Sequence, residues 1–496
     1  MPSELVAALE KAGSPSILVV GDLMLDRYLW GDVERVSPEA PVPVVQIDRS
    51  RTHSTVGGAG SVVRDLVALG ARVVAGGVVG DDSDGGEIRD RLTHDGVDTT
   101  LVVADKRRPT TQKTRVLSKS HQLLRIDSED TAPLVPESAK KLIDGVGARI
   151  PTVDAVILSD YDKGVLSAES IRKIVAAARK ATKPVWADPA RGRDFKVFSG
   201  VTAVTPNRKE TEDATGLTLA YGSVPEEAAR KLLLALDLDV AVITLDSEGL
   251  YYLAKSGESA MIPARPRAAY DVTGAGDMVI AAATFGVAAG MPLGTAVEFA
   301  NFAAGMEVER VGVEPIPREE MVRRLLHEAG ISSEKVVALP ELIRLLAQRR
   351  RRGERIVFTN GCFDIFHLGH VRFLQFARSQ GDLLVVGLNS DSSVRRIKGA
   401  PRPVLPENER AAILAALEAV GYVVIFDEDT PAALIKNVQP DILVKGEDWR
   451  EKGVVGRDTV EAGGGKVILA PLVPNLSTSN IVKKILDAYS GGKQGE

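Results

Sequence analysis

The chain has 496 residues, of which 44% are hydrophobic and 26% are charged. These are ordinary globular values, and the length exceeds what one hydrophobic core usually serves, so we expect two or three domains. The formal net charge of −5 argues against a generic basic surface for nucleic acid, and the single cysteine, Cys362, excludes an internal disulfide and a cysteine-based zinc site.

The sequence carries no pattern typical of export or of membrane insertion. Glu4, Glu10 and Lys11 interrupt the N-terminus before any signal-like apolar run. The longest apolar stretch, residues 278–291, is shorter than the roughly 20 residues that span a bilayer, and its alanines and glycines suit a buried helix. We therefore expect a cytoplasmic protein with no nucleic-acid or membrane partner.

Short apolar strands alternate with helices along the first part of the chain. Strands are expected at residues 16–20, 155–158, 184–187 and 240–244, and helices at 168–180 and 226–236. Polar residues follow the first three strands closely, as Asp22, Ser159-Asp160 and Asp188. This alternation predicts an α/β fold with a parallel sheet and a site along one edge of it.

The alternation stops and restarts, which predicts the domain limits. A first domain is expected over residues 1–330, a linker with a leading helix over 331–354, and a second α/β domain over 355–496 that begins with a strand at 355–359. Four arginines at 349–352 precede Gly353. This pattern is typical of a helix C-terminus, where cations meet the dipole and glycine ends the helix; an RNA or phosphate patch is the alternative.

The segment Asp271-Val-Thr-Gly-Ala-Gly-Asp277 is the first candidate site. It precedes the apolar helix, so its backbone N–H groups would lie at a helix N-terminus, which favours anions. Gly274 and Gly276 let that backbone approach a phosphate, and Asp277 can accept a proton from an attacking hydroxyl. The pattern indicates phosphoryl transfer. It completes neither a dinucleotide fingerprint nor a Walker loop, and a glycine-rich turn capped by aspartate is the alternative.

This segment resembles the second signature of the ribokinase-like (pfkB) carbohydrate kinases, and other features match in order over residues 16–314. Gly57-Gly58 opens a helix where that family holds its sugar, and Asn207-Arg-Lys-Glu210 resembles its Asn-x-x-Glu element. Segments 37–43, 115–118 and 158–161 look like the heptose-7-phosphate kinase branch. The resemblance implies a ribokinase-like α/β domain with a small β lid, for which residues 32–48 are the candidate, and pairing into a homo-oligomer through this domain.

The same resemblance implies roles for individual residues. Asp277 would deprotonate the anomeric hydroxyl of the sugar. The nucleotide and its phosphates, with Mg²⁺, would lie against Gly274, Ala275, Gly276, Asn207, Arg208, Lys209, Glu210 and Asn301. The sugar would contact Asp22, Asp26, Gly57 and Gly58; for the two aspartates, a strand-end turn with a helix cap is the alternative. Ser61, Asp65 and Ala190-Arg191 depart from the family's usual residues, which leaves the exact sugar open.

The second candidate site is the segment from Gly361 to His370, which follows the strand at 355–359 and leads into a helix at 371–377. Of six histidines in the chain, His367 and His370 fall within four residues, on one face of a helical turn. Imidazoles at a helix N-terminus can donate hydrogen bonds to a triphosphate as charge builds on the leaving pyrophosphate. A metal pair without an evident third ligand and a solvated helix start are the alternatives, and Cys362 is more typical of packing than of a nucleophile.

This stretch resembles the His-x-Gly-His nucleotidyltransferases, the cytidylyltransferase-like group with a Rossmann-like fold. Residues 389–391, 396–399, 402–403 and 444–446 continue the match, and residues 476–481 resemble a Ser-Thr-Thr motif with Ser479 in place of the second threonine. The resemblance implies that His367 and His370 stabilise the transition state. Nucleotide and phosphates would contact Asp364, Asp391, Lys398, Arg402, Lys445, Ser477 and Thr478. No direct protein metal site is predicted.

Together the two halves resemble the bifunctional heptose enzymes of bacterial surface-polysaccharide synthesis. This implies phosphorylation of D-glycero-D-manno-heptose 7-phosphate at C1 from ATP, and adenylyl transfer from ATP to heptose 1-phosphate. The partners would be ATP and sugar phosphates, with Mg²⁺ accompanying ATP. Two alternatives stay open: another sugar or polyol kinase fused to a cytidylyltransferase, because the histidine segment does not distinguish adenine from cytosine, and a catalytically silent sugar or nucleotide sensor.

Overall fold

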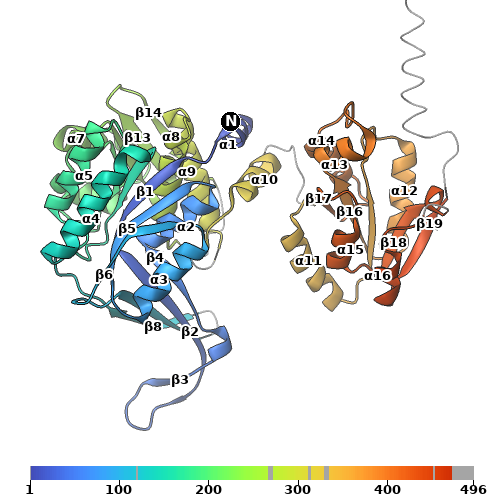
Figure 1. The fold of residues 1–496 in the computed structure, drawn as a ribbon, viewed down its shortest axis with the longest axis horizontal. Helices are drawn as coiled ribbons and strands as arrows, with labels where there is room; N and C mark the ends of the chain where they lie inside the picture. The colour runs from blue at the N-terminus through green and yellow to red at the C-terminus, as the bar shows by residue number, and fades with distance from the viewer. Residues whose placement is uncertain are drawn as a thin grey trace, which may run out of the picture. The chain divides into compact units, whose positions relative to one another are not determined.

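The computed structural model describes residues 2–118, 121–265, 272–310, 314–328, 335–450 and 453–471. The chain forms two compact units, Ser3–Val322 and Arg323–Glu496. Each is an α/β unit around its own sheet (Figure 1). The domain limits expected from the sequence stay predictions.

The first unit is built on a sheet in the order β14-β13-β12-β11-β10-β9-β1-β5-β6. Neighbouring strands from β12 to β6 are parallel, and β13 and β14 are antiparallel. This confirms the predicted parallel sheet. The strands are β1 (Ser16–Gly21), β5 (Arg72–Gly80), β6 (Asp98–Asp105), β9 (Ala155–Ser159), β10 (Val185–Asp188), β11 (Ala203–Val204), β12 (Val240–Thr244), β13 (Gly249–Ala254) and β14 (Ser259–Pro263).

Helices cover both faces of this sheet (Figure 1). Leu18 and Val20 of β1 pack into one core with α4, α5 and α7, whereas Ile17 and Val19 are equally buried and point to the other face, because successive strand residues alternate. On that face α8 packs against α2 and α9. The helices are α1 (Pro2–Lys11), α2 (Ala59–Ala68), α3 (Ser83–His94), α4 (Pro136–Arg149), α5 (Ala168–Lys180), α6 (Arg208–Thr215), α7 (Glu226–Leu236), α8 (Ala275–Ala288) and α9 (Leu293–Glu307), and α10 (Arg318–Glu328) contains the limit between the two units.

A second, smaller sheet forms the predicted β lid of this unit. Its order is β3-β2-β7-β8, and β4 also pairs with β2. Residues 32–48 fold back on themselves, with Asp32 opposite Gln46, and the β2–β3 hairpin extends from the unit (Figure 1). The strands are β2 (Leu23–Val36), β3 (Pro43–Ile47), β4 (His53–Gly58), β7 (Thr111–Ser118) and β8 (His121–Ser128).

The second unit has a parallel sheet in the order β17-β16-β15-β18-β19. The chain moves outward from β15 in one direction and then in the other, which is the Rossmann-like arrangement, with a switch point between β15 and β18. The strands are β15 (Ile356–Gly361), β16 (Leu383–Asn389), β17 (Tyr422–Phe426), β18 (Ile442–Gly446) and β19 (Lys466–Ala470).

Two cores, one on each face, hold the helices of the second unit to its sheet. The arginine run ends α11, and Gly353 follows with φ of 76°, which confirms the predicted helix terminus. No helix in the described ranges is long and apolar enough to cross a membrane. The helices are α11 (Leu339–Arg351), α12 (Leu368–Arg378), α13 (Asp391–Lys398), α14 (Glu407–Ala415), α15 (Ala432–Val438) and α16 (Arg457–Ala462).

Candidate active sites

Carboxylates gather where neighbouring strands of the first unit end. Asp22 follows β1 and accepts hydrogen bonds from the backbone N–H groups of Tyr161 (2.9 Å), Lys163 (3.2 Å) and Val165 (3.2 Å). Burial raises the pKa of Asp22, and these three amides act in the opposite direction. Asp22 therefore fixes the loop after β9, and its predicted contact with a sugar stays a prediction.

Asp277 lies in the first turn of α8 and is only 8% exposed. Its Oδ1 accepts a hydrogen bond from the Tyr161 hydroxyl at 2.6 Å. Burial raises the pKa of Asp277 to about 7, with a smaller contribution in the same direction from Asp26, while Tyr161 and Lys113 oppose the rise. A carboxylate with a pKa near neutrality is suited to accept a proton at physiological pH.

The start of α8 leaves room for an anion. Gly274 is the N-cap, with φ of 91°, a conformation that residues with a Cβ rarely adopt. A Cβ on Gly276 would meet no atom within 4 Å, so the backbone is open on that side. Free N–H groups at such a terminus attract phosphate. Asp271, the first residue of the motif, lies outside the described residues.

Asn207 and Glu210 form a capping box at the start of α6, with two reciprocal hydrogen bonds of 2.9 Å. Asp188 lies at the end of β10, close to Glu210 and Asp277. Burial, and then the negative charges of Asp277 and Glu210, raise the pKa of Asp188 well above its usual value. A divalent cation would relieve such a group of carboxylates. In the described part of the chain, no three His, Cys, Asp or Glu side chains form a ready-made metal site.

Three predicted nucleotide contacts have partners of their own. Arg208 is bound by Asp246 at 3.0 Å and by Glu248, and the Lys209 ammonium lies 2.7 Å from Asp213. The Asn301 amide donates to the carbonyl of residue 263 at 2.9 Å. The structure thus brings Asn207, Glu210 and Asp277 toward one region. The side chains of Arg208, Lys209 and Asn301 instead stabilise neighbouring segments.

The predicted sugar side is held together by close packing. A Cβ on Gly57 would lie 1.9 Å from Oδ2 of Asp26, and one on Gly58 would lie 2.4 Å from the carbonyl oxygen of Asp22. The glycine pair is therefore required by the two aspartates beside it. Asp26 also forms an ion pair with Arg115.

Sequence reasoning gave no role at this site to Tyr161, Lys113 or Asp65. Tyr161 falls within a segment that resembles heptose kinases, but only the fold shows its bond to Asp277. The Lys113 ammonium lies 5.7 Å from the centre of the Tyr161 ring, and nothing in the sequence around it indicates this. Asp65 is fully buried near Asp277, and neither of its side-chain oxygens forms a hydrogen bond within the described residues.

In the second unit, the two histidines meet at the start of α12. His367 is the N-cap, and its ring stacks on that of His370 with centroids 3.8 Å apart and planes 18° apart. Phe363 contacts His370 edge-on, and Phe366 packs at a tilt. Burial, then His367 and Lys398, lower the pKa of His370 to about 4, so this imidazole is neutral near pH 7. The predicted shared face is confirmed.

Asp364 and Arg402 lie together. Arg402 Nε is 2.9 Å from Asp364 Oδ2, and Asp364 Oδ1 accepts the backbone N–H groups of Val404 (2.6 Å) and Leu405 (3.2 Å). The pair thus fixes the loop at 402–405 beside the histidine segment. Their contact with a nucleotide stays a prediction.

A buried arginine that the sequence did not reveal joins the loops after β15 and β16. Arg410 is 1% exposed and donates to the carbonyls of Cys362 at 2.6 Å and Asn389 at 2.9 Å. It also donates a hydrogen bond to Asp391 Oδ1 at 2.7 Å. Arg410 therefore stabilises the two loops that carry the predicted nucleotide residues.

Lys445 lies at the switch point of the sheet, where ligands of such folds bind. It is almost fully buried, donates to the carbonyl of Asn360 at 3.2 Å and lies over the Trp449 ring. Burial lowers its pKa to about 8. Lys398 is exposed but close enough to lower the pKa of His370. Ser477 and Thr478 lie outside the described residues.

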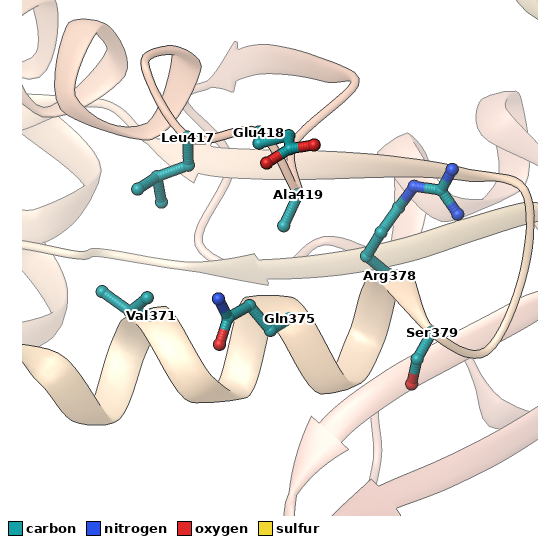
Figure 2. A pocket seen from close by; sticks show the side chains of 7 residues that line it. All are labelled: Val371, Gln375, Arg378, Ser379, Leu417, Glu418 and Ala419. Atoms are coloured by element: carbon teal, nitrogen blue, oxygen red, sulfur yellow. The ribbon is translucent and has the colours of Figure 1, made fainter.

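A cavity of about 420 Å³ lies beside α12 (Figure 2). Neither His367 nor His370 is among its lining residues, so it is not part of the site described above. It is lined by Val371, Gln375, Arg378, Ser379, Leu417, Glu418 and Ala419.

Comparisons with known proteins find a match for each of the two units. Residues 14–320 match the family model of pfkB carbohydrate kinases, and residues 358–484 match the cytidylyltransferase-like model. The bifunctional protein HldE of Geobacter sulfurreducens is 45% identical over 96% of this chain and 97% of its own, and that of Wolinella succinogenes is 44% identical over 95% and 98%.

Among solved structures, ribokinase of Arabidopsis thaliana, in complex with ribose and ATP, shares the fold of the first unit. The TM-score is 0.52 at 21% identity, over 63% of this chain and 99% of that one. The chain therefore belongs to the family of bifunctional HldE proteins, and it is an enzyme that combines a pfkB carbohydrate kinase with a cytidylyltransferase-like nucleotidyltransferase.

Proposed function

We propose that the first unit phosphorylates D-glycero-D-manno-heptose 7-phosphate at C1 with ATP. The second unit then transfers an adenylyl group from ATP to heptose 1-phosphate and releases pyrophosphate, which yields ADP-heptose. The kinase product still carries its 7-phosphate, so a separate phosphatase acts between the two steps. The observation that carries the kinase assignment is Asp277, a nearly buried carboxyl with a pKa of about 7 at the open start of α8. We also propose that the protein works in the cytoplasm, where ATP and sugar phosphates are available.

In the kinase step, Asp277 takes the proton of the C1 hydroxyl as that oxygen attacks the γ-phosphorus of ATP, and the bond from this phosphorus to the bridging oxygen breaks to release ADP. The Tyr161 hydroxyl holds the carboxylate in place. The N–H groups of residues 274–276 receive the transferring phosphoryl group, because a helix N-terminus favours negative charge. Asp22 positions the loop that carries Tyr161, and Asp26 with the glycine pair faces the sugar.

Magnesium, when bound together with ATP, would supply charge neutralisation in both steps. In the kinase, Asp188 and Glu210 fit that ion: the pKa of Asp188 is raised by burial and by the neighbouring carboxylates Asp277 and Glu210. A cation beside them would restore the charged forms.

In the transferase step, an oxygen of the sugar phosphate attacks the α-phosphorus of ATP, and no protein nucleophile is required. His367 and His370, the latter neutral and the former with a pKa lowered by burial, donate hydrogen bonds to the phosphates as charge develops on pyrophosphate. Lys398, Arg402 and Lys445 add positive charge around the triphosphate. Ser477 and Thr478 complete the phosphate site in this proposal.

The kinase unit also has a surface suited to a second copy of the chain. Val33, Val36, Val42 and Ile47 of the β2–β3 hairpin are exposed apolar residues. Such clusters commonly mark interfaces between proteins. We therefore include a homo-oligomer formed through the lid in the proposal. Sedimentation of the wild type and of Val36→Asp tests it, and identical masses for both would contradict it.

Product analysis by mass spectrometry tests the two reactions. Heptose 7-phosphate with ATP should give heptose 1,7-bisphosphate alone, and ADP-heptose should appear only when a phosphatase is added. Asp277→Asn should abolish the bisphosphate but still convert heptose 1-phosphate to ADP-heptose. Preference for CTP over ATP would contradict the adenylyl assignment. One substitution that silences both activities in a folded protein would contradict the two-site proposal.

A further inference from the structure

One face of the lid carries a row of charged side chains, and of these the two proposed reactions use only Asp26. Strand register places Asp26 of β2, Lys113 of β7 and Asp127 of β8 opposite one another. Residues paired in this way project from the same face of a sheet. Two residues further along, Arg115 and Arg125 are opposite each other on that same face.

This face looks toward the proposed kinase site. The alternating residues Arg27 and Gln112 project from the opposite face, where both bind Asp84 of α3, at 3.0 and 2.8 Å. Lys113 instead lies over the ring of Tyr161, whose hydroxyl is bonded to Asp277. A ligand that lies along the Tyr161 ring can therefore reach the Lys113 ammonium while one of its hydroxyls meets Asp277.

The cations around Lys113 are paired with carboxylates. Arg115 pairs with Asp26, and Arg125 forms two bonds of 2.9 Å with Asp127. From the loop after β9, Lys163 pairs with Glu129 at 2.7 Å.

Lys113 itself has no carboxylate within ion-pair distance in the described ranges, although Asp26 and Asp127 stabilise its charge from further away. Its pKa is lowered by burial first, and Arg125 and Lys163 lower it further. A half-buried ammonium without a close counter-ion is unfavourable, and a bound anion would relieve it. The opposite charges within each of the three neighbouring ion pairs cancel, so within the described residues the ammonium of Lys113 leaves this face with one unpaired positive charge.

We propose that Lys113, flanked by Arg125 and Lys163, binds the phosphate group that the sugar already carries when it enters the kinase site. This rests on the proposed function and names the part of the chain that recognises a phosphorylated sugar rather than a free one. The ligand is a phosphate monoester dianion at the end of the sugar remote from the hydroxyl that is phosphorylated.

The test compares heptose 7-phosphate with heptose lacking the phosphate, with the full-length wild type and Lys113→Met. Loss of a charge-assisted hydrogen bond to phosphate should raise KM for heptose 7-phosphate by roughly 10- to 100-fold. Lys113 also lowers the pKa of Asp277, so the comparison is made at pH 8.5, above that pKa, where kcat and the KM for ATP should stay near wild type. The free sugar should be an equally poor substrate for both proteins, because it has no group for Lys113 to bind.

Two further variants separate binding from other effects. Lys106→Met removes an exposed lysine whose ammonium is 3.8 Å from Asp81, and it should change neither KM. Lys113→Arg keeps the charge and should recover part of the affinity for the phosphorylated sugar. An equal loss on both sugars, or a fall in kcat at unchanged KM, would mean that Lys113 acts on the transferred phosphoryl group and would overturn the proposal.

Failure of the proposed function gives a different result. A wild type that phosphorylates free heptose but not heptose 7-phosphate would overturn both. A wild type active on heptose 7-phosphate, together with an unaffected Lys113→Met, would overturn only the phosphate site.

Discussion

The hydroxyl of Tyr161 donates a hydrogen bond of 2.6 Å to Asp277, and this bond opposes the effect of burial on the same carboxyl. Burial favours the neutral acid, whereas a donor stabilises the carboxylate. The balance leaves Asp277 with a pKa of about 7, so a substantial fraction is ionised under physiological conditions. Asp22 maintains this balance indirectly, because it holds the backbone of Tyr161.

A pH profile of the kinase reaction checks this balance. A base must be deprotonated, so kcat/KM should rise with pH through about 7 and level off above it. Tyr161→Phe removes the donor to the charged form and should move this rise to higher pH, with a larger loss at pH 6 than at pH 8.5. Tyr221→Phe, at an exposed tyrosine, is the matched control. A Tyr161→Phe profile that superimposes on the wild type would show that the bond does not tune the base.

Gly57→Ala should weaken sugar binding specifically. The new Cβ would lie 1.9 Å from Asp26 Oδ2, so Asp26 must move and its pair with Arg115 is disturbed. We expect KM for the sugar to rise about tenfold or more, since a charge-assisted bond is worth roughly 1.5–3 kcal/mol, while KM for ATP stays constant. Gly86→Ala is the control, because its Cβ meets nothing within 4 Å. Equal sugar KM values for the two variants would be evidence against the predicted role of Asp26.

The histidine pair leads to a prediction for the second activity. With a pKa of about 4, His370 should show no titration between pH 6 and 8 in NMR spectra of the free protein. His367→Ala and His370→Ala should each lower kcat of nucleotidyl transfer on the order of 10²- to 10³-fold, by analogy with other preorganised donors. Sugar phosphorylation should be unchanged. His94→Ala, at an exposed position at the end of α3, should leave both activities intact. A His370 signal that titrates near pH 6.5 would contradict the neutral-donor role.

The parts of the sites that could be predicted from the sequence are those set by local geometry. His367 and His370 are three residues apart, so a helical turn alone brings their rings together. Asp277 lies within one turn of the glycines that begin α8. For Asn207 and Glu210 the sequence pattern has two meanings. The same spacing that indicated a phosphate-binding element also forms a capping box at the start of α6.

The residues that were missed depend on contacts between distant segments. Lys113 reaches the kinase site only because β7 pairs with β2 in one particular register, and a shift of one residue would turn its side chain to the other face. Arg410 touches Cys362 and Asn389, 48 and 21 residues away. No periodicity or motif reports such a contact, so an isolated arginine in a helical pattern looks like a surface residue.

Arg410→Met should destabilise the second unit while sparing the first. It removes bonds to two carbonyls and to Asp391 behind the predicted nucleotide residues. We expect the free energy of unfolding to fall by about 3 kcal/mol, the lower end for a broken buried pair, because Asp391 is partly exposed. Nucleotidyl transfer should then be lost at a lower temperature than in the wild type, with the inactivation temperature of the kinase unchanged.

Arg410→Lys should restore little of this stability, since an ammonium cannot reproduce the planar, two-pronged hydrogen bonding of a guanidinium. Arg450→Met, which breaks an exposed pair with Glu447, is the control. If Arg410→Met and Arg450→Met lose nucleotidyl transfer at the same temperature, Arg410 does not stabilise the second unit in the way that its burial and three partners indicate.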